Sequence, residues 1–307
     1  MPHLRPGEVA IDAGLVRRLV AAQFPQWAGL PVEPVGLSGL DNATYRLGEE
    51  MSVRLPRLPR WLGQVEREQR WLPWLAPRLP LPVPVPLARG VPGEGYPFDW
   101  SVYRWLDGEN ADLDGIADPR RAAAGLAEFF GALQSLDPAG GPPPEASNGF
   151  RGVPVDDERD SAVVATRMRA RIGALEGLVD TGAVTAVWEA ALAAPAWDGP
   201  PVWIHGDPAP ANMLMRDGRL SAVIDFGTMA VGDPACDLIV AWAFLTAETR
   251  DVFRAALPVD DATWARGRAW GLTACLPTAA DLSGGDPERA ARVRSRLDDL
   301  VADHQTG

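Results

Sequence analysis

The sequence predicts an α+β fold in which a small N-terminal lobe of about 100 residues carries an antiparallel sheet and one key helix, and a larger C-terminal lobe is mainly helical. Three short strand-like runs fall within residues 32–57, and a fourth, apolar run covers residues 100–106. After the fourth run, apolar residues recur mainly at helical spacing. We therefore expect one lobe at residues 1–107 and the other at residues 108–307.

In the N-terminal part, residues 9–23 show the spacing of an amphipathic helix, with Asp12 as its cap. The three strand-like runs follow. Residues 62–76 then predict the key helix of this lobe, because their apolar side chains recur along one face. The prolines of the next segment, LPLPVPVPLARG, require an extended connector before the fourth strand.

The C-terminal part opens with Asp118 and Pro119, which stand in the order typical of a helix cap and first turn, and this helix should run to about Leu136. The proline and glycine density of residues 141–155 predicts a loop. Further helices are expected at residues 157–175, 181–194, 235–256, 260–276 and 287–303.

Composition excludes several classes of function. The net charge of −12 argues against a nucleic-acid partner and would attract a polycationic substrate. No run reaches the roughly 18 apolar residues of a membrane span, and the N-terminus lacks the layout of a signal peptide, so we expect a soluble cytoplasmic protein. Cys236 and Cys275 lie in apolar helical patterns without metal spacing, which predicts buried free thiols.

The residues with the clearest chemistry lie in WIHGDPAPANML, residues 203–214, and in the later VIDFG. Asp207, Asn212 five residues on, and Asp225 heading a Phe-Gly pair are the groups needed to orient a hydroxyl and to hold magnesium against nucleotide phosphates. Each motif alone is also typical of ordinary turns. Their ordered combination predicts a phosphoryl-transfer site, and a hairpin turning on Asp217 and Gly218 should bring Asn212 beside Asp225.

These motifs resemble those of the aminoglycoside phosphotransferase family, which also includes choline and macrolide kinases. The resemblance rests on HGDPAPANML and VIDFGTMAVGDPACDL, and more loosely on LSGLDNATYRL, VRLPR, EQRWLPWL and VYRWLDGE, which together cover most of residues 35–245. It implies a two-lobed, protein-kinase-like fold with a nucleotide between the lobes. It also implies that Asp207 is the catalytic base and that Asn212 and Asp225 are the Mg²⁺ ligands.

The turn between the first two strands, residues 37–43, is where kinases fold a loop over the phosphates. Gly39 is its single glycine, so an ordinary hairpin loop is the alternative. The resemblance favours a phosphate loop, and Ser38, Asn42 and Ala43 are the small residues expected near the nucleotide.

Arg54 stands at the end of the next strand, where kinases and most of the family place a lysine that pairs with the α- and β-phosphates. Arginine keeps the charge and can bind phosphate with two donors, but its guanidinium is longer and planar. The chain contains no lysine, so genomic replacement with function retained is one explanation, and a weakened site is the other. On the key helix, Glu68 or Glu66 could pair with Arg54, and the EQRWL pattern favours Glu68.

The strand at residues 100–106 resembles the hinge between kinase lobes. The Arg104 carbonyl and the Leu106 amide would then bond the adenine edge, with Tyr103 behind it favouring ATP over GTP on steric grounds. An ordinary core strand is the alternative. In the C-terminal part, His205 and Asp237 are expected to hold the catalytic loop rather than to react.

We therefore expect an ATP- and Mg²⁺-dependent phosphotransferase that acts on a hydroxyl of a small, cationic acceptor, most plausibly an aminoglycoside-like antibiotic. A macrolide, a nucleoside antibiotic, choline or a sugar is the alternative acceptor, because the helical lobe that selects it has no readable pocket. A non-catalytic, nucleotide-binding pseudokinase is the alternative from another class, supported by Arg54 and the glycine-poor loop. The sequence carries no signature of an oligomeric state.

Overall fold

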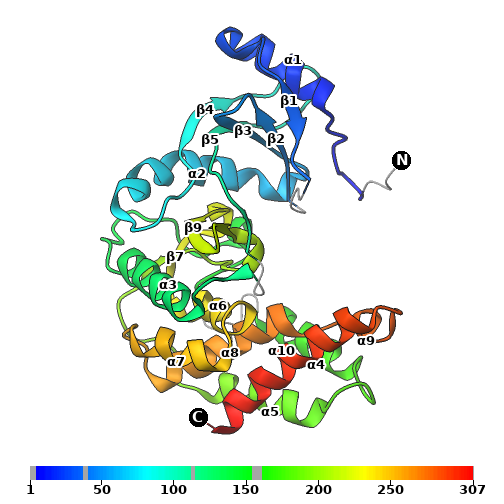
Figure 1. The fold of residues 1–307 in the computed structure, drawn as a ribbon, viewed down its shortest axis with the longest axis vertical. Helices are drawn as coiled ribbons and strands as arrows, with labels where there is room; N and C mark the ends of the chain where they lie inside the picture. The colour runs from blue at the N-terminus through cyan, green and yellow to red at the C-terminus, as the bar shows by residue number, and fades with distance from the viewer. Residues whose placement is uncertain (1–4, 37–40, 112–114, 154–160, 307) are drawn as a thin grey trace.

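The computed structural model describes residues 5–36, 41–111, 115–153 and 161–306, and of residues 161–166 it describes the backbone only. Figure 1 shows an antiparallel sheet at one end of the molecule and a helical part at the other. The sheet has five strands in the order β1-β2-β3-β5-β4, and all its pairings are antiparallel. Its strands are β1 Val32–Pro34, β2 Asn42–Leu47, β3 Met51–Pro56, β4 Pro86–Gly90 and β5 Trp100–Arg104.

Helix α1, Ala13–Gln23, covers the outer face of this sheet. The Asp12 carboxylate accepts a hydrogen bond from the Leu15 amide at 2.7 Å, so the predicted cap is confirmed. The predicted start at residue 9 is wrong, because residues 8–12 are not helical, and Val9 and Ile11 pack against the same apolar cluster. This cluster buries side chains of α1 and alternate residues of the strands.

Helix α2, Leu62–Leu75, lies between the sheet and the helical part (Figure 1). The Gln69 side-chain amide donates to the Ala88 carbonyl and to the Ser101 hydroxyl, each at 2.9 Å, which fixes α2 to the two strands β4 and β5. On the opposite side, Leu72 and Leu75 are fully buried in the core of the helical part. The predicted key helix therefore connects both cores.

Strand β4 corrects the sequence prediction of a plain connector for the proline-rich segment. Pro86 begins this strand, and β4 pairs on one side only, at the edge of the sheet. A proline has no amide proton to donate, so it is tolerated at an edge position where that donor is not needed.

The C-terminal part contains the predicted helices, with one correction. Residues 235–256 do not form a single helix, because Thr246 caps a new one by accepting from the Thr249 amide at 3.4 Å. The short helix α9 is an addition. The helices are α3 Pro119–Gln134, α4 Ser161–Gly173, α5 Thr181–Ala193, α6 Ile239–Ala243, α7 Ala247–Ala255, α8 Asp261–Cys275, α9 Ala279–Ser283 and α10 Pro287–Thr306.

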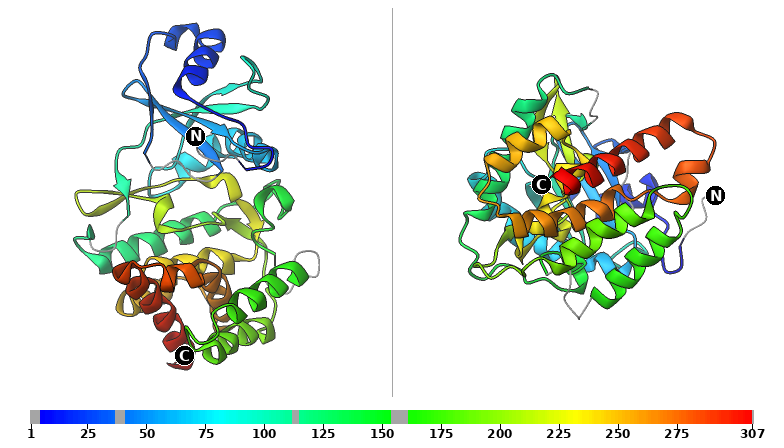
Figure 2. Two further views of the ribbon diagram at one scale, coloured as in Figure 1. Left: turned by 90° about the vertical axis from the view of Figure 1, so that its right-hand side faces the viewer. Right: turned by 90° about the horizontal axis from the view of Figure 1, so that it is seen from below.

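The lower helices pack around α8, which contacts α5, α6 and α10 (Figure 2). Two small antiparallel sheets lie between these helices and α2: one pairs β7 with β10, and the other has the order β6-β8-β9. Cys236 and Cys275 are buried free thiols, as predicted. Within the described ranges, no helix has the length and apolar character needed to cross a membrane. The small strands are β6 Glu109–Asn110, β7 Val202–Ile204, β8 Met213–Arg216, β9 Arg219–Val223 and β10 Ala230–Gly232.

Candidate active site

The predicted hairpin between Asn212 and Asp225 is present as β8 and β9. Asp217 and Gly218 form its turn with φ angles of 53° and 71°, and positive φ at both central residues matches the twist of two-residue hairpins. Beyond the last strand pair, the Ile224 amide donates to the Asn212 carbonyl at 2.8 Å. The hairpin therefore ends with Asn212 beside the residue that precedes Asp225.

The strand that leads to Asp207 is held by Asp237. One carboxylate oxygen of Asp237 accepts from the His205 amide at 2.8 Å, and the other accepts from the Gly206 amide at 2.7 Å. Asp237 is 1% exposed, and this burial raises its pKa. His205 is buried, with Nε2 2.9 Å from the Ile224 carbonyl. Both residues thus have the structural contacts expected from the sequence.

Asp207 follows this strand with its carboxylate open to solvent. Its side chain is 43% exposed, whereas its backbone amide and its backbone carbonyl are both hydrogen-bonded. The Asp207 amide donates to His205 Nδ1 at 3.2 Å, and the Asn212 side-chain nitrogen donates to the Asp207 carbonyl at 2.8 Å. The second bond holds the Asn212 amide group in place and leaves its side-chain oxygen available as a ligand.

Arg54 and Glu68 form the predicted ion pair between β3 and α2. Arg54 Nη1 lies 3.1 Å from Glu68 Oε1, and Arg54 Nη2 lies 2.7 Å from Asp225 Oδ1. Burial raises the pKa of Glu68, whose side chain is 4% exposed. Burial also works to lower the pKa of Arg54, but the charges of Asp225 and Glu68 outweigh it and raise that pKa. Arg54 thus links the sheet, α2 and the segment after the hairpin.

Asp225 adopts a left-handed backbone conformation, with φ 65° and ψ 64°, which is uncommon for a residue other than glycine. Burial would raise the pKa of its carboxyl, but the charge and hydrogen bond of Arg54 hold that pKa below its usual value. Asp225 is therefore an ionised carboxylate in a strained position, which is typical of functional sites.

The residues predicted for the hinge lie at and just after the end of β5. Tyr103 is 2% exposed, and its hydroxyl donates to Glu68 Oε2 at 2.5 Å, so the ring stands between the sheet and α2. Burial raises the pKa of this phenol well above its ordinary value. The Arg104 amide donates to the Val85 carbonyl at 2.9 Å. Leu106 follows two residues later, in the segment that leads to the helical part.

The predicted phosphate loop is only partly described. Ser38 and Gly39 lie outside the described residues. The Asn42 side chain donates to Gln64 Oε1 on α2 at 3.1 Å. Ala43 is 2% exposed and belongs to the apolar cluster beneath α1, so its methyl group points away from the sheet face that carries Arg54.

Three further polar residues approach this site without a motif that marks them in the sequence. Arg67 on α2 is 5% exposed and donates to the Gly227 carbonyl at 2.5 Å. Asp41 has a raised pKa, caused first by burial and then by the charges of Asp225 and Asp207. Arg151 Nη2 lies 3.5 Å from Asp207 Oδ1. The alternating charges around Arg67 indicated only a surface helix, and the loop positions of Asp41 and Arg151 gave no signal.

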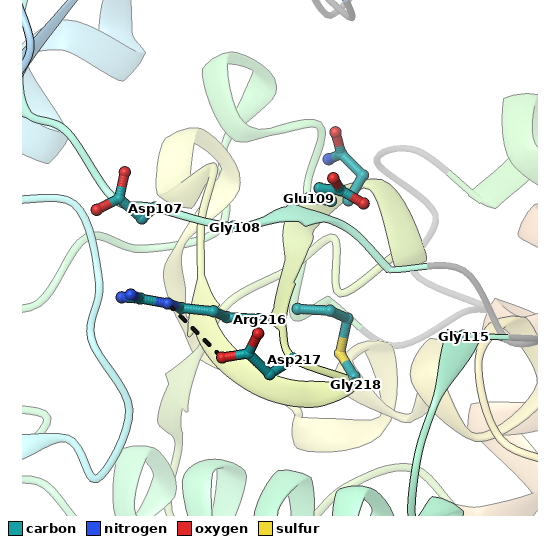
Figure 3. Close-up of a pocket in the computed structure, with 9 residues that line it drawn as sticks. Asp107, Gly108, Glu109, Gly115, Arg216, Asp217 and Gly218 are labelled. Carbon is teal, nitrogen blue, oxygen red and sulfur yellow. Dashed lines mark ion pairs between the residues drawn. The ribbon is translucent and has the colours of Figure 1, made fainter.

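A pocket of about 530 Å³ lies near the hinge, at the tip of the β8–β9 hairpin (Figure 3). None of the predicted site residues lines it. Arg216 and Asp217 form an ion pair of 4.0 Å at its rim, and both side chains are largely exposed, so this contact contributes little to stability. The lining residues are Asp107, Gly108, Glu109, Asn110, Gly115, Met215, Arg216, Asp217 and Gly218.

Comparison with known proteins gives one family and several similar structures. A family model described as a phosphotransferase enzyme family matches residues 32–270. The structure resembles the GDP complex of wild-type aminoglycoside 2′-phosphotransferase-IIIa, with a TM-score of 0.66 at 22% identity, covering 96% of this chain and 100% of that one. Among curated proteins, no match to the chain was found.

Two other solved structures have the same fold. The streptomycin–ATP ternary complex of APH(2″)-IIa gives a TM-score of 0.56 at 19% identity, covering 87% of this chain and 88% of that one. The apoenzyme of a macrolide 2′-phosphotransferase from Brachybacterium faecium gives 0.57 at 24% identity, covering 94% of this chain and 98% of that one. The predicted two-lobed, kinase-like α+β fold is thus confirmed.

Proposed function

Because the family match covers more than half of its length, the chain belongs to the phosphotransferase enzyme family, and from this premise we propose that it transfers the γ-phosphate of ATP to a hydroxyl of a small molecule. The observation that carries this proposal is the arrangement of Asp207, Asn212 and Asp225. The buried Asp237 carboxylate fixes the backbone just before Asp207, and the β8–β9 hairpin brings Asn212 close to Asp225.

ATP would lie between the sheet and the helical part. Arg54 is the cation for its α- and β-phosphates. Glu68 pairs with its guanidinium, and the Tyr103 hydroxyl donates to Glu68. The Arg104 carbonyl and the Leu106 amide would bond the adenine edge, and the backbone of residues 38–43 would cover the phosphates. The complexes of similar structures with GDP and with ATP support nucleotide use, and the bulk of Tyr103 favours ATP.

The residues present fit a magnesium ion. Asp225 is ionised and its side chain is 35% exposed, with Oδ1 on Arg54. Asn212 offers its side-chain oxygen. Among the described residues, no cluster of three or more His, Cys, Asp or Glu side chains could hold a metal by itself. Magnesium is commonly held by one or two protein ligands together with nucleotide phosphates, where it neutralises charge, so this donor set suits it.

Asp207 would orient the acceptor hydroxyl and accept its proton. Its carboxylate is open to solvent, so an acceptor can reach it, and its fixed backbone holds the carboxylate in one position. No covalent enzyme intermediate is needed. A non-catalytic pseudokinase would not need Asp207, Asn212 and Asp225 in this geometry, so their arrangement favours the enzyme.

The acceptor is most plausibly an aminoglycoside-like antibiotic. Similar structures are described in complexes with kanamycin, gentamicin and streptomycin, and the net charge of −12 would attract such polycations. A macrolide is the second candidate, because a macrolide phosphotransferase is also among the similar structures.

We further propose a lobe boundary near residues 107 and 108. The apolar cluster around α1 and the sheet contains residues up to Val102, and the other cluster is built mainly from the helical part. Helix α2 contributes Leu72 and Leu75 to that second cluster, so the lobes share a helix rather than separate cleanly.

The test is ADP release from Mg-ATP in the presence of hydroxylated antibiotics and small cationic metabolites. We expect turnover with one class of acceptor and its loss in Asp207→Ala. If no nucleotide binds to the folded protein, the proposal is wrong.

A further inference from the structure

We propose that Arg151 is a further catalytic residue, whose guanidinium contacts the acceptor oxygen and the phosphoryl group during transfer. The inference rests on the proposed phosphotransferase function. Its starting point is the ion pair of 3.5 Å between Arg151 Nη2 and Asp207 Oδ1. Arg151 comes from the loop between α3 and α4, far in the sequence from the motifs that carry the other site residues.

The loop around Arg151 is fixed in an uncommon backbone conformation. Its neighbours Gly149, Phe150 and Gly152 have φ angles of 66°, 52° and 84°. A positive φ is costly for a phenylalanine and persists only where the surroundings impose it. On the far side of Arg151, the Gly152 carbonyl accepts from the Asp233 amide at 2.8 Å. The backbone therefore holds Arg151 at one place beside the catalytic loop.

The side chain of Arg151 is oriented by an aromatic ring. Its Cζ lies 5.1 Å from the ring centroid of Trp270, which is 8% exposed and belongs to α8 in the helical part. Arg54, by contrast, comes from β3 of the sheet and contacts Asp225. The guanidinium beside Asp207 is thus packed on the helical part, where we expect the acceptor.

Arg151 is close enough to act on the reacting atoms. An acceptor hydroxyl bonded to Asp207 would lie roughly 2.6–3.2 Å from its carboxylate, and the attacked phosphorus about 3–3.5 Å further on. A donor that already contacts this carboxylate can therefore reach the acceptor oxygen and the phosphoryl oxygens. In the transfer, a lone pair of the acceptor oxygen forms the new O–P bond, the bond from the γ-phosphorus to the bridging oxygen breaks with its electrons leaving on ADP, and the hydroxyl proton passes to Asp207.

The transferring group needs positive charge at this position. Charge spreads over the three equatorial oxygens of the phosphoryl group, and an arginine that contacts them accelerates related reactions by roughly 10³–10⁵. The residues between Asp207 and Asn212 are proline and alanine only, and the chain has no lysine. Arg54 is held by Glu68 and Asp225. Arg151 is the cation that the described structure brings to Asp207.

The test uses a mimic of the transferring group and needs no acceptor. Calorimetry would measure the affinity of the full chain for MgADP alone and for MgADP with aluminium fluoride, which imitates a planar phosphoryl group. In Arg151→Met we expect MgADP affinity within about twofold of wild type, and at least a tenfold loss of the fluoride-dependent gain. Arg151→Lys keeps the charge, so it should recover part of that gain.

Arg254→Met is the matched control. Arg254 also lies over a tryptophan, 4.9 Å from the Trp264 centroid, and pairs with an aspartate at 2.6 Å, but this partner, Asp261, is largely exposed. It should keep both affinities. An unchanged fluoride-dependent gain in Arg151→Met, with MgADP still bound, would overturn the role of Arg151 and leave the proposed function standing. A wild-type chain that binds no MgADP would overturn both.

Discussion

Removal of Arg54 should destabilise the protein by an amount that depends on pH. In Arg54→Met, the Glu68 carboxylate keeps its buried position, with its side chain 4% exposed, but loses its cationic partner at 3.1 Å. An unpaired charge at such a site is costly, so the group takes up a proton instead. The Tyr103 hydroxyl remains beside it but supplies no positive charge.

The loss in free energy of unfolding follows from the cost of keeping Glu68 protonated in the folded variant. With an ordinary pKa of 4.5 for Glu68 in the unfolded chain, holding a proton at pH 7 costs up to about 3.4 kcal/mol, from roughly 1.36 kcal/mol per pH unit. At pH 5 the same cost is below about 1 kcal/mol. The loss of the Asp225 contact adds about 1 kcal/mol or less at either pH, because that side chain is 35% exposed.

The sign follows from proton binding. Without Arg54, the folded protein holds one proton on Glu68 that the unfolded chain releases above pH 4.5. Stability relative to wild type therefore falls over the pH range between the raised pKa of Glu68 in the folded wild-type protein and its still higher pKa in the folded variant. Urea denaturation at several pH values between 5 and 7 would measure this slope.

Arg54→Met/Glu68→Gln is the matched control. It removes the Glu68 carboxylate and keeps an acceptor for the Tyr103 hydroxyl, so the part of the pH dependence that comes from Glu68 should disappear. Only a smaller part should remain, from the half-exposed Asp225 carboxylate that also loses Arg54. An equal destabilisation of Arg54→Met at pH 5 and pH 7, or an equally steep slope in the double variant, would refute the reasoning.

Three further predictions concern the support of the site. Asp237→Asn turns an acceptor of two backbone amides into a group with one acceptor, so unfolding free energy should fall by about 1–3 kcal/mol in urea titrations, and no change would contradict the assigned role. Gly227→Ala places a methyl group 2.7 Å from the Gln64 side chain, so it should lower the free energy of unfolding by about 1–3 kcal/mol. Gly125→Ala in α3 meets no such neighbour within 4 Å and should raise that free energy by about 0.5–1 kcal/mol. Equal effects of the two substitutions in thermal unfolding would be inconsistent with the packing described. Asp225→Asn should weaken Mg²⁺-dependent nucleotide binding at least tenfold in calorimetry while the fold is retained, and wild-type affinity would exclude Asp225 as a ligand.

The sequence predicted those parts of the site that depend on local patterns. The hairpin turn at Asp217 and Gly218 and the cap at Asp12 each follow from chemistry within a few residues. The pairing of Arg54 with Glu68 could be expected because a strand and the next helix of this family place them together. The family and fold predictions are confirmed by the family match and by the similar structures.

The remaining features depend on contacts between distant segments. Arg151 reaches Asp207 only because its loop is held in positive-φ conformations against the strand that follows Asp225, and no periodicity reports such a contact. The break at Thr246 was hidden by an apolar pattern that continues through it, since one capping threonine changes the backbone without changing hydropathy.

The most direct test of the proposed function is the mass of the acceptor after incubation with Mg-ATP. We predict that one acceptor from the antibiotic panel gains a single phosphoryl group with the wild-type chain, in step with ADP release, and gains none with Asp207→Ala. An acceptor phosphorylated equally by both proteins would contradict the role of Asp207, and ADP release without any phosphorylated acceptor would contradict transfer to a small-molecule hydroxyl.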